Sequence, residues 1–171
     1  MRTKKVIVLE YDDKWKENFN RIKKELEAVL KKLPISIEHV GSTSVVGLAA
    51  KPIIDIDIII KNNSDLEEAI KRLSTIGYIH EGNLGIKNRE AFRYEGKEHL
   101  QVHHIYVCPE NSEELKRHII FRDYLRKNLD AVEYYSRVKK EGANLYPNNI
   151  EKYIEYKSLC ISELYKKCGL E

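Results

Sequence analysis

The chain has 171 residues, of which 42% are hydrophobic and 33% are charged, which excludes a disordered chain and is typical of one folded domain. Its net charge of +3 is too small to predict a nucleic-acid partner, unless the lysines and arginines gather on one face. Three cysteines without a CxxC pair, and no apolar run of transmembrane or signal-peptide length, predict a cytoplasmic protein with reduced thiols and no membrane partner.

The first half of the chain is predicted to alternate strands with helices. Capping residues such as Asp12, Asp13 and Ser64 precede apolar residues at helical spacing, whereas Pro34 and Pro52 end the segments before them. The expected elements are a strand at 4–10, a helix at 12–32, a strand at 35–40, a short helix at 42–50, a strand at 53–60 and a helix at 64–77.

The second half is predicted to add a strand hairpin, one further strand and a helical tail. The hairpin covers 78–85 and 89–94, and a longer strand covers 98–107. Helices are expected at 111–128, where Asn111 and Glu114 form a capping box, and at 130–140 and 149–167. The pattern predicts one α+β domain over residues 1–171, with a core at about 1–108 and a helical C-terminal part at about 111–168.

Two aspartates lie one residue apart in the strand predicted at 53–60. Because successive side chains of a strand point to opposite faces, Asp55 and Asp57 share one face and the isoleucines between and around them cover the other. Two adjacent carboxylates repel each other unless a cation lies between them, and hard oxygen ligands suit Mg²⁺ or Mn²⁺. We therefore expect Asp55 and Asp57 to bind one of these metal ions.

A Gly-Ser turn precedes these aspartates, with twelve residues between Ser42 and Asp55. Glycine lets the backbone approach a phosphate closely, and a serine at a helix start can bind anionic oxygens. This combination resembles the signature of the DNA polymerase β-like nucleotidyltransferases. Within that superfamily, EHVGSTSVVGLAAKPIIDI, HHIYVCPENSEELKRHIIFRDYLR and the pair Tyr153 and Lys157 resemble the GrpB family over nearly the whole chain. The resemblance implies a nucleotidyltransferase fold, with a mixed β-sheet covered by helices.

The third strand departs from the superfamily, which usually places another carboxylate there. No aspartate lies within 98–107, where the carboxylate Glu98 stands only at the very start, and Tyr106 stands where the GrpB pattern has a histidine. Alternation of polar residues puts His103 on the site's face together with His99 and Gln101, whereas the resemblance favours His104 on the opposite face. A β-bulge would reconcile the two assignments. We favour His104 as the third catalytic residue beside Asp55 and Asp57.

Several basic and small residues are predicted to contact the substrate. For Lys51, phosphate contact and snorkelling explain the residue equally well, and for Arg122 a ligand contact competes with a fixed salt bridge. Lys157 is one helical turn from Tyr153, and either a triphosphate contact or an ordinary charged face accounts for it. The predicted substrate- or phosphate-binding residues are Gly41, Ser42, Thr43, Lys51, Arg89, Arg122 and Lys157.

Two functions follow from these patterns. The first is a Mg²⁺- or Mn²⁺-dependent nucleotidyltransferase that uses a nucleoside triphosphate and an unidentified acceptor, with His104 acting as a base or in support of the aspartates. The second is a non-catalytic module that binds a nucleotide or phosphorylated metabolite in the same pocket. The absence of a third carboxylate on the third strand favours the second function.

Overall fold

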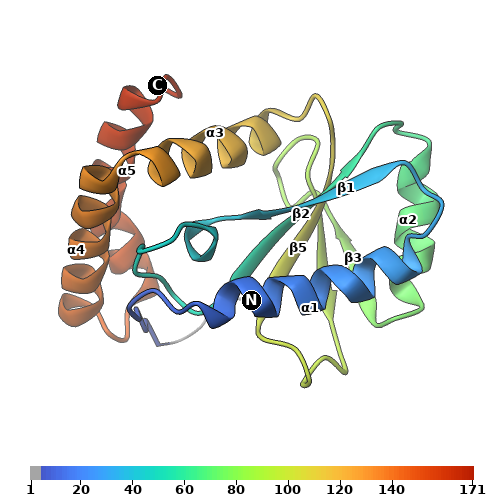
Figure 1. Cartoon of the computed structure of the whole chain (residues 1–171), viewed down its shortest axis with the longest axis horizontal. Helices are drawn as coiled ribbons and strands as arrows, with labels where there is room; N and C mark the ends of the chain where they lie inside the picture. The colour runs from blue at the N-terminus through green and yellow to red at the C-terminus, as the bar shows by residue number, and fades with distance from the viewer. Residues whose placement is uncertain (1–4) are drawn as a thin grey trace.

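A computed structural model describes residues 5–171, which form a five-stranded sheet with helices on both faces (Figure 1). The strands are β1 (Ile35–Val40), β2 (Ile54–Ile60), β3 (Tyr78–Gly82), β4 (Glu90–Tyr94) and β5 (His103–Pro109). The helices are α1 (Lys14–Val29), the 3₁₀ turn η1 (Ser42–Ser44), α2 (Asp65–Ser74), α3 (Glu113–Lys127), α4 (Leu129–Leu145) and α5 (Ile150–Lys167).

The sheet is mixed, with strand order β1-β2-β5-β4-β3. β2 and β5 run parallel, while the pairs β1–β2, β4–β5 and β3–β4 are antiparallel. Chain segments 43 or more residues apart are thereby brought side by side at β2 and β5, because Ile54 pairs with His103 and Ile60 with Pro109. The predicted α+β class with a mixed sheet is confirmed.

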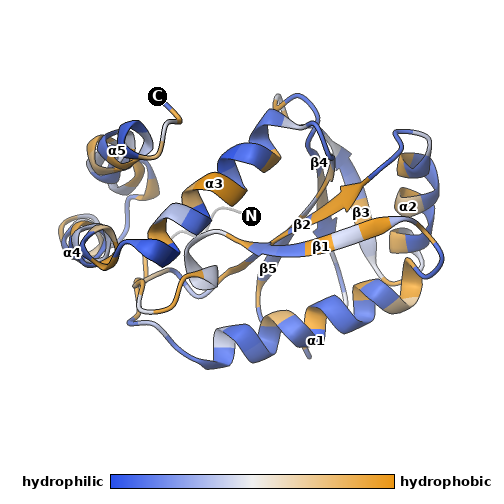
Figure 2. Ribbon diagram, turned by 45° about the horizontal axis from the view of Figure 1, so that its top comes forward, coloured by the Kyte–Doolittle hydropathy of each residue, from blue (hydrophilic) through white to orange (hydrophobic). Residues whose placement is uncertain are grey.

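The helices form layers around this sheet. α1 and α3 lie on opposite sides of the strands, and α4 and α5 lie side by side at one end of the sheet (Figures 1 and 2). None of the helices in the described part of the chain has the length and apolar character that crossing a membrane requires.

One face of the sheet packs against α1 and α2 and forms the main core. The even-numbered isoleucines of β2 are at most 2% exposed and contact Ile22 and Leu26 of α1 and Leu73 of α2. Fully burying a side chain of this size contributes about 1.5–3 kcal/mol. The predicted apolar side of β2 is therefore what anchors the strand that carries the aspartates.

A second apolar cluster joins the segment after the Gly-Ser turn to the C-terminal helices. Val45 and Leu48 are at most 1% exposed and pack with Leu125 of α3, Val132 of α4 and Leu164 of α5. This contact fixes the helical tail against the turn, so side chains from α4 and α5 can reach the residues that follow β1.

Two N-terminal predictions are wrong. Lys4 lies outside the described residues, and residues 5–10 form only an isolated bridge in which the amides of Leu9 and Ala50 each donate to the other's carbonyl. The predicted helix at 42–50 is limited to Ser42–Ser44, because Gly47 has a φ of 84° and the chain then extends toward Ala50. The two segments are joined by this bridge, and the Val6 amide donates to the Pro147 carbonyl instead of to a strand.

Two further predictions differ in the region of β5 and α3. The strand expected at 98–107 begins only at His103, because residues before it are held against α1, where Lys97 Nζ lies 3.0 Å from Glu25 Oε2. α3 has no Asn111–Glu114 capping box; Ser112 Oγ accepts from the Leu115 amide at 3.3 Å. Glu114 turns instead toward a histidine of the same helix.

Candidate functional site

The second face of the sheet is polar where the first is apolar. The register pairs Asp55 with His104 and Asp57 with Tyr106, so these four side chains share the face that α3 covers. Glu38 of β1 pairs with Asp57 on the same face. The two aspartates therefore lie on an interior strand beside polar residues of β5, and Asp57 also has Glu38 of β1 on its other side.

Gly41 places the end of β1 directly against Asp55. Its φ of +72° is one that side-chain-bearing residues rarely adopt, and a Cβ there would lie 2.3 Å from Asp55 Oδ2. The glycine of the Gly-Ser turn is thus required for the close approach of backbone and carboxylate. Ser42 follows at once and begins η1.

His104, and not His103, is the histidine beside the aspartates. His104 Nδ1 lies 3.2 Å from Asp55 Oδ1. His103 is 1% exposed on the opposite face, stacked on Tyr94 with ring centroids 4.4 Å apart and bonded to the Tyr78 hydroxyl at 2.8 Å. No bulge reconciles the two assignments: β5 starts at His103, so the alternation through 99 and 101 belongs to a segment that is not a strand.

Asp57 is joined to α3 through a histidine that the sequence analysis did not single out. His118 Nδ1 lies 2.6 Å from Asp57 Oδ2, and its Nε2 lies 3.2 Å from Glu114 Oε1. Burial alone would lower the pKa of His118, but the hydrogen bond and charge of Asp57 outweigh it and raise that pKa. Glu114 thus brings a further carboxylate to this face, beside Asp55, Asp57 and Glu38, from a helix and not from β5.

The second oxygen of Asp57 suits a hard cation. Asp57 is 0% exposed, and its Oδ1 has no hydrogen-bond partner among residues 5–171. Burial raises the pKa of Asp57, with the contact to His118 offsetting part of that effect. Within the same residues no three His, Cys, Asp or Glu side chains are grouped to hold a metal. Mg²⁺ is commonly bound by one or two carboxylates, with waters and substrate phosphates supplying the other ligands, so Asp55 and Asp57 fit it.

A cavity lined by three lysines opens beside Asp55. This lysine cavity has a volume of about 160 Å³. Its polar lining residues are Ser42, Thr43, Lys51, Asp55, His104, Lys139, Tyr153 and Lys157. Lys51 comes from the loop before β2, Lys139 from α4 and Lys157 from α5, so the cavity forms only when the helical tail packs on the sheet.

Burial destabilises the positive charges in the lysine cavity. It lowers the pKa of Lys157 to about 8, with the nearby Lys51 ammonium adding to the effect, and it lowers the pKa of Lys139 well below the usual lysine value. Lys139 is 3% exposed, bonds Ser42 Oγ and donates to the Ala49 carbonyl at 3.2 Å. Clustered ammonium groups that have lost much of their hydration form a site for a polyanion, which would offset their repulsion.

The other predicted substrate residues have different surroundings. Thr43 lines the cavity, but its hydroxyl donates to the Ile53 carbonyl at 3.2 Å and lies 2.9 Å from His39 Nε2. Arg122 donates to Glu38 at 2.6 Å and to Asp123 at 2.9 Å, which is the salt-bridge alternative. Arg89 lies outside the lysine cavity, with its guanidinium carbon 4.4 Å from the centroid of the Tyr106 ring.

Lys139 and His118 are the residues that the sequence analysis missed. A signal existed for Lys139, because it continues the helical spacing of buried Val132, Tyr135 and Ser136, where a lysine requires an explanation. His118 falls inside the motif quoted for the family resemblance, but nothing in its local spacing points to Asp57. Only the packing of α3 on the sheet brings the two together.

Comparisons with known proteins agree with the fold and motifs. A family model described as "GrpB protein" matches residues 5–167. The UPF0157 protein YqkA of Bacillus subtilis is 34% identical over 154 residues, which are 90% of this chain but 44% of YqkA, so the chain spans less than half of that relative.

Two solved structures extend the comparison. A GrpB protein of Enterococcus faecalis is 35% identical, with a TM-score of 0.82 over 95% of this chain and 96% of that one. The Cid1 poly(U) polymerase, in a structure with MgGTP bound, is 12% identical, with a TM-score of 0.56 over 79% of this chain and 44% of Cid1. The second likeness concerns the fold alone.

Proposed function

The chain belongs to the GrpB family, and we propose that it is a metal-dependent nucleotidyltransferase that transfers a nucleotidyl group from a nucleoside triphosphate to an acceptor. One observation carries the proposal: a cavity with three lysines opens directly beside Asp55 and shares Ser42 with the Gly-Ser turn. The Asp55 carboxylate, which suits a cation, and lysines that suit a polyphosphate thus border the same space. The fold likeness to a poly(U) polymerase supports the same reading.

The β- and γ-phosphates belong in the lysine cavity. Lys51 and Lys157 supply positive charge from two sides, and the Ser42 hydroxyl, held by Lys139, faces the same space. Because Gly41 has no side chain, the space beside Asp55 Oδ2, where a Cβ would lie 2.3 Å away, stays open to a phosphate. Lys139 positions Ser42 because it ties the turn to α4.

Asp55 and Asp57 would hold Mg²⁺ or Mn²⁺. The ion, when bound, neutralises phosphate charge and stabilises the charge that develops on transfer. His104 orients Asp55 through Oδ1, and His118 fixes Asp57 through Oδ2, which leaves Asp57 Oδ1 free to coordinate. The two histidines act here as positioning residues.

A specific observation favours the second function, a module that binds a nucleotide or phosphorylated metabolite without turnover. β5 carries Tyr106, and no carboxylate, opposite Asp57, and the only extra carboxylate near His118 in the described chain, Glu114, is engaged with that histidine. Such a module would use the lysine cavity as it stands and would need neither aspartate for chemistry.

The experiment measures pyrophosphate release from the four common nucleoside triphosphates with Mg²⁺ or Mn²⁺, in the presence of a metabolite and RNA panel. Nucleotide binding is followed in parallel by calorimetry. Wild type is compared with Asp55→Asn and with Asp13→Asn, which removes the same charge at an exposed position before α1.

Metal-dependent release that is lost in Asp55→Asn and kept in Asp13→Asn supports the transferase. Tight nucleotide binding without release, unaffected by Asp55→Asn, supports the binding module. If no triphosphate binds, or if Lys157→Met binds as tightly as wild type, both functions are wrong.

A further inference from the structure

A second cavity meets the lysine cavity at Ser42 and Asp55 and extends to the other side of that aspartate. We name it the aromatic cavity; its volume is about 200 Å³. Its walls are formed by α3, α4 and α5 together with the Gly-Ser turn. The lining residues used below are Asp55, Arg117, Phe121, Arg122, Tyr135 and Tyr165.

The aromatic cavity lies where the transfer reaction requires the attacking group to bind. The attacking and leaving oxygens must lie roughly in line on opposite sides of the α-phosphorus. If the leaving pyrophosphate occupies the lysine cavity on one side of Asp55, the attacking oxygen must come from the other side, where the aromatic cavity lies.

The walls of the aromatic cavity favour a ring. Phe121 meets Tyr165 edge to face with centroids 4.8 Å apart, and its centroid lies 6.0 Å from that of Tyr135. Aromatic surfaces of this kind contact the flat face of an aromatic compound or the apolar face of a sugar. At about 200 Å³ the cavity is smaller than the ~300–1,000 Å³ of sites for drug-sized ligands, so it suits a metabolite with one ring.

The two arginines of the aromatic cavity differ in what holds them. Arg122 is 9% exposed in its side chain and is engaged by Glu38 and Asp123. Arg117 is 50% exposed in its side chain; its nearest approach to Glu114 is 3.9 Å, and its guanidinium carbon lies 6.0 Å from the centroid of the Tyr165 ring. A guanidinium held this loosely at a cavity mouth is free to pair with a carboxylate or phosphate.

We propose that the aromatic cavity is the acceptor site and that the acceptor is a small ring compound, aromatic or sugar, with a hydroxyl group and one anionic substituent facing Arg117. The inference rests on the proposed function. The acceptor oxygen forms a bond to the α-phosphorus, the bond from that phosphorus to the α,β-bridging oxygen of the triphosphate breaks and leaves that oxygen on pyrophosphate, and the hydroxyl proton leaves to water. Pyrophosphate departs through the lysine cavity.

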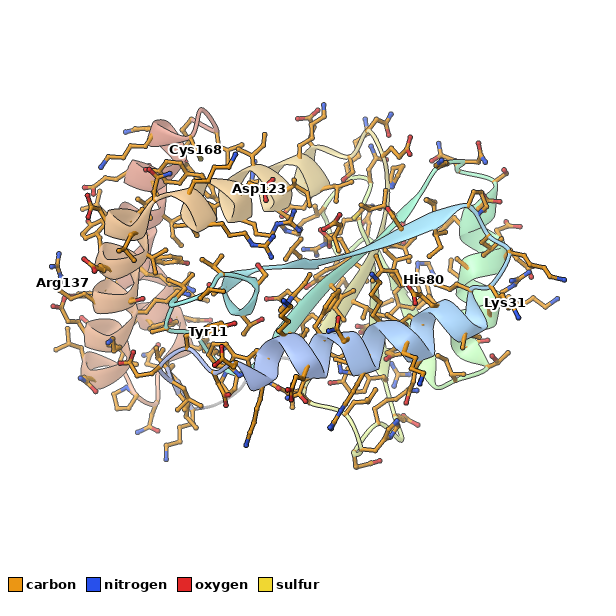
Figure 3. All side chains as sticks on the ribbon, in the orientation of Figure 1. Tyr11, Lys31, His80, Asp123, Arg137 and Cys168 are labelled. Atoms are coloured by element: carbon orange, nitrogen blue, oxygen red, sulfur yellow. The ribbon has the colours of Figure 1, made fainter. Side chains whose placement is uncertain are left out.

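The test titrates ¹⁵N-labelled protein with 4-(hydroxymethyl)benzoate and with glucose 6-phosphate, each against its neutral counterpart, benzyl alcohol or glucose. Titrations are run with and without Mg²⁺ and α,β-methylene-ATP. Arg117→Gln is compared with Arg137→Gln, whose guanidinium lies 5.5 Å from the Tyr134 ring centroid on the outer side of α4, away from both cavities (Figure 3).

At least one anionic probe is expected to shift the amide signals of residues 117–125. Arg117→Gln should weaken the affinity for that probe fivefold or more, while the affinities for the neutral counterpart and for the nucleotide analogue change less than twofold. Arg137→Gln should change none of them. Comparison of 4-(hydroxymethyl)benzoate with glucose 6-phosphate shows whether the cavity prefers an aromatic ring or a sugar ring. Absence of shifts from both anionic probes, or weakened binding of the nucleotide analogue alone in Arg117→Gln, overturns the acceptor site. Failure of the analogue to bind overturns the proposed function instead, while the probe titration still decides whether the aromatic cavity binds an anionic ring compound.

Discussion

The two faces of β2 differ in what determines them, although they belong to the same seven residues. On one face, Ile54, Ile56 and their neighbours pack with apolar side chains of α1 and α2. Such contacts are not specific to individual atoms, so other apolar side chains of similar size could make them. On the other face, Asp55 and Asp57 depend on individual atoms of His104 and His118. The apolar face therefore stabilises the fold. Because β2 is fixed by this packing, the carboxylates on its polar face are held close together.

This difference predicts which substitutions should lower stability and which should lower activity. Loss of apolar contacts lowers the free energy of unfolding in proportion to the surface and volume lost. Replacing Asp57 by its amide removes a charge that is costly to bury, which offsets part of the lost pairing with His118, so the change should affect function more than stability. The following variants separate the two effects.

The largest effect is expected from Asp57→Asn. Pyrophosphate release should fall about 10³-fold, because several kcal/mol of charge stabilisation depends on the metal that Asp57 would hold. The free energy of unfolding, measured in urea, should stay within about 1 kcal/mol of wild type, since the uncharged amide has nearly the same shape. A large loss of stability would show that Asp57 is a structural residue.

On the apolar face, Ile56→Ala should lower the free energy of unfolding by about 2–5 kcal/mol, since Ile56 is 0% exposed and leaves a cavity. The matched control is Ile59→Ala on the polar side of the same strand, where the side chain is only half-buried and the loss should be smaller. Equal losses in urea unfolding would contradict the distinction between the faces.

His39 is a polar residue on the apolar face and makes stability depend on pH. Its ring stacks on Phe19 with centroids 4.6 Å apart, and burial lowers the pKa of His39 from 6.5 to about 4. Because the unfolded chain binds a proton that the folded chain rejects between these values, stability should fall as pH falls through this window, by ~3 kcal/mol in total. Urea unfolding of His39→Gln at pH 7, 5.5 and 4.5 should show a flatter dependence; an unchanged slope would rule out His39 as its source.

The smallest effect concerns Lys157. Lys157→Met should weaken binding of α,β-methylene-ATP about tenfold, or ~1.4 kcal/mol. Because the pKa of Lys157 is lowered to about 8, wild-type affinity should also decrease as pH rises through 8, whereas Lys157→Arg should keep its affinity. Lys152→Met is the control. Lys152 is on α5, as Lys157 is, but lies outside the lysine cavity, with its Nζ 5.9 Å from the Tyr146 ring centroid.

The two faces also differ in how much the sequence could predict. The strands at 35–40 and 53–60, and the shared face of Asp55 and Asp57, follow from alternation within a few residues. The start of α5 near 149 was likewise local, and there Asn149 Oδ1 accepts from the Lys152 amide at 3.0 Å. Such features depend on residues that are close together in the chain, so they can be predicted from a single sequence.

The partners of the aspartates could not be predicted in this way. His118 is 61 residues from Asp57, and Lys139 is 97 residues from Ser42, so only the packing of α3 and α4 reveals either contact. The start of β5 was misplaced for the same reason. Glu25 of α1 holds Lys97 and His99 and removes that segment from the sheet, and no local pattern records this.

Gly41 offers a way to close the site without altering its charge. A methyl group at this position would occupy the space within 2.3 Å of Asp55 Oδ2 while every lysine, histidine and carboxylate stayed in the chain. Gly41→Ala is therefore an obstructed form of the protein with unchanged net charge. In a cell, it would separate phenotypes caused by loss of the site from those caused by loss of the protein or of its surface electrostatics.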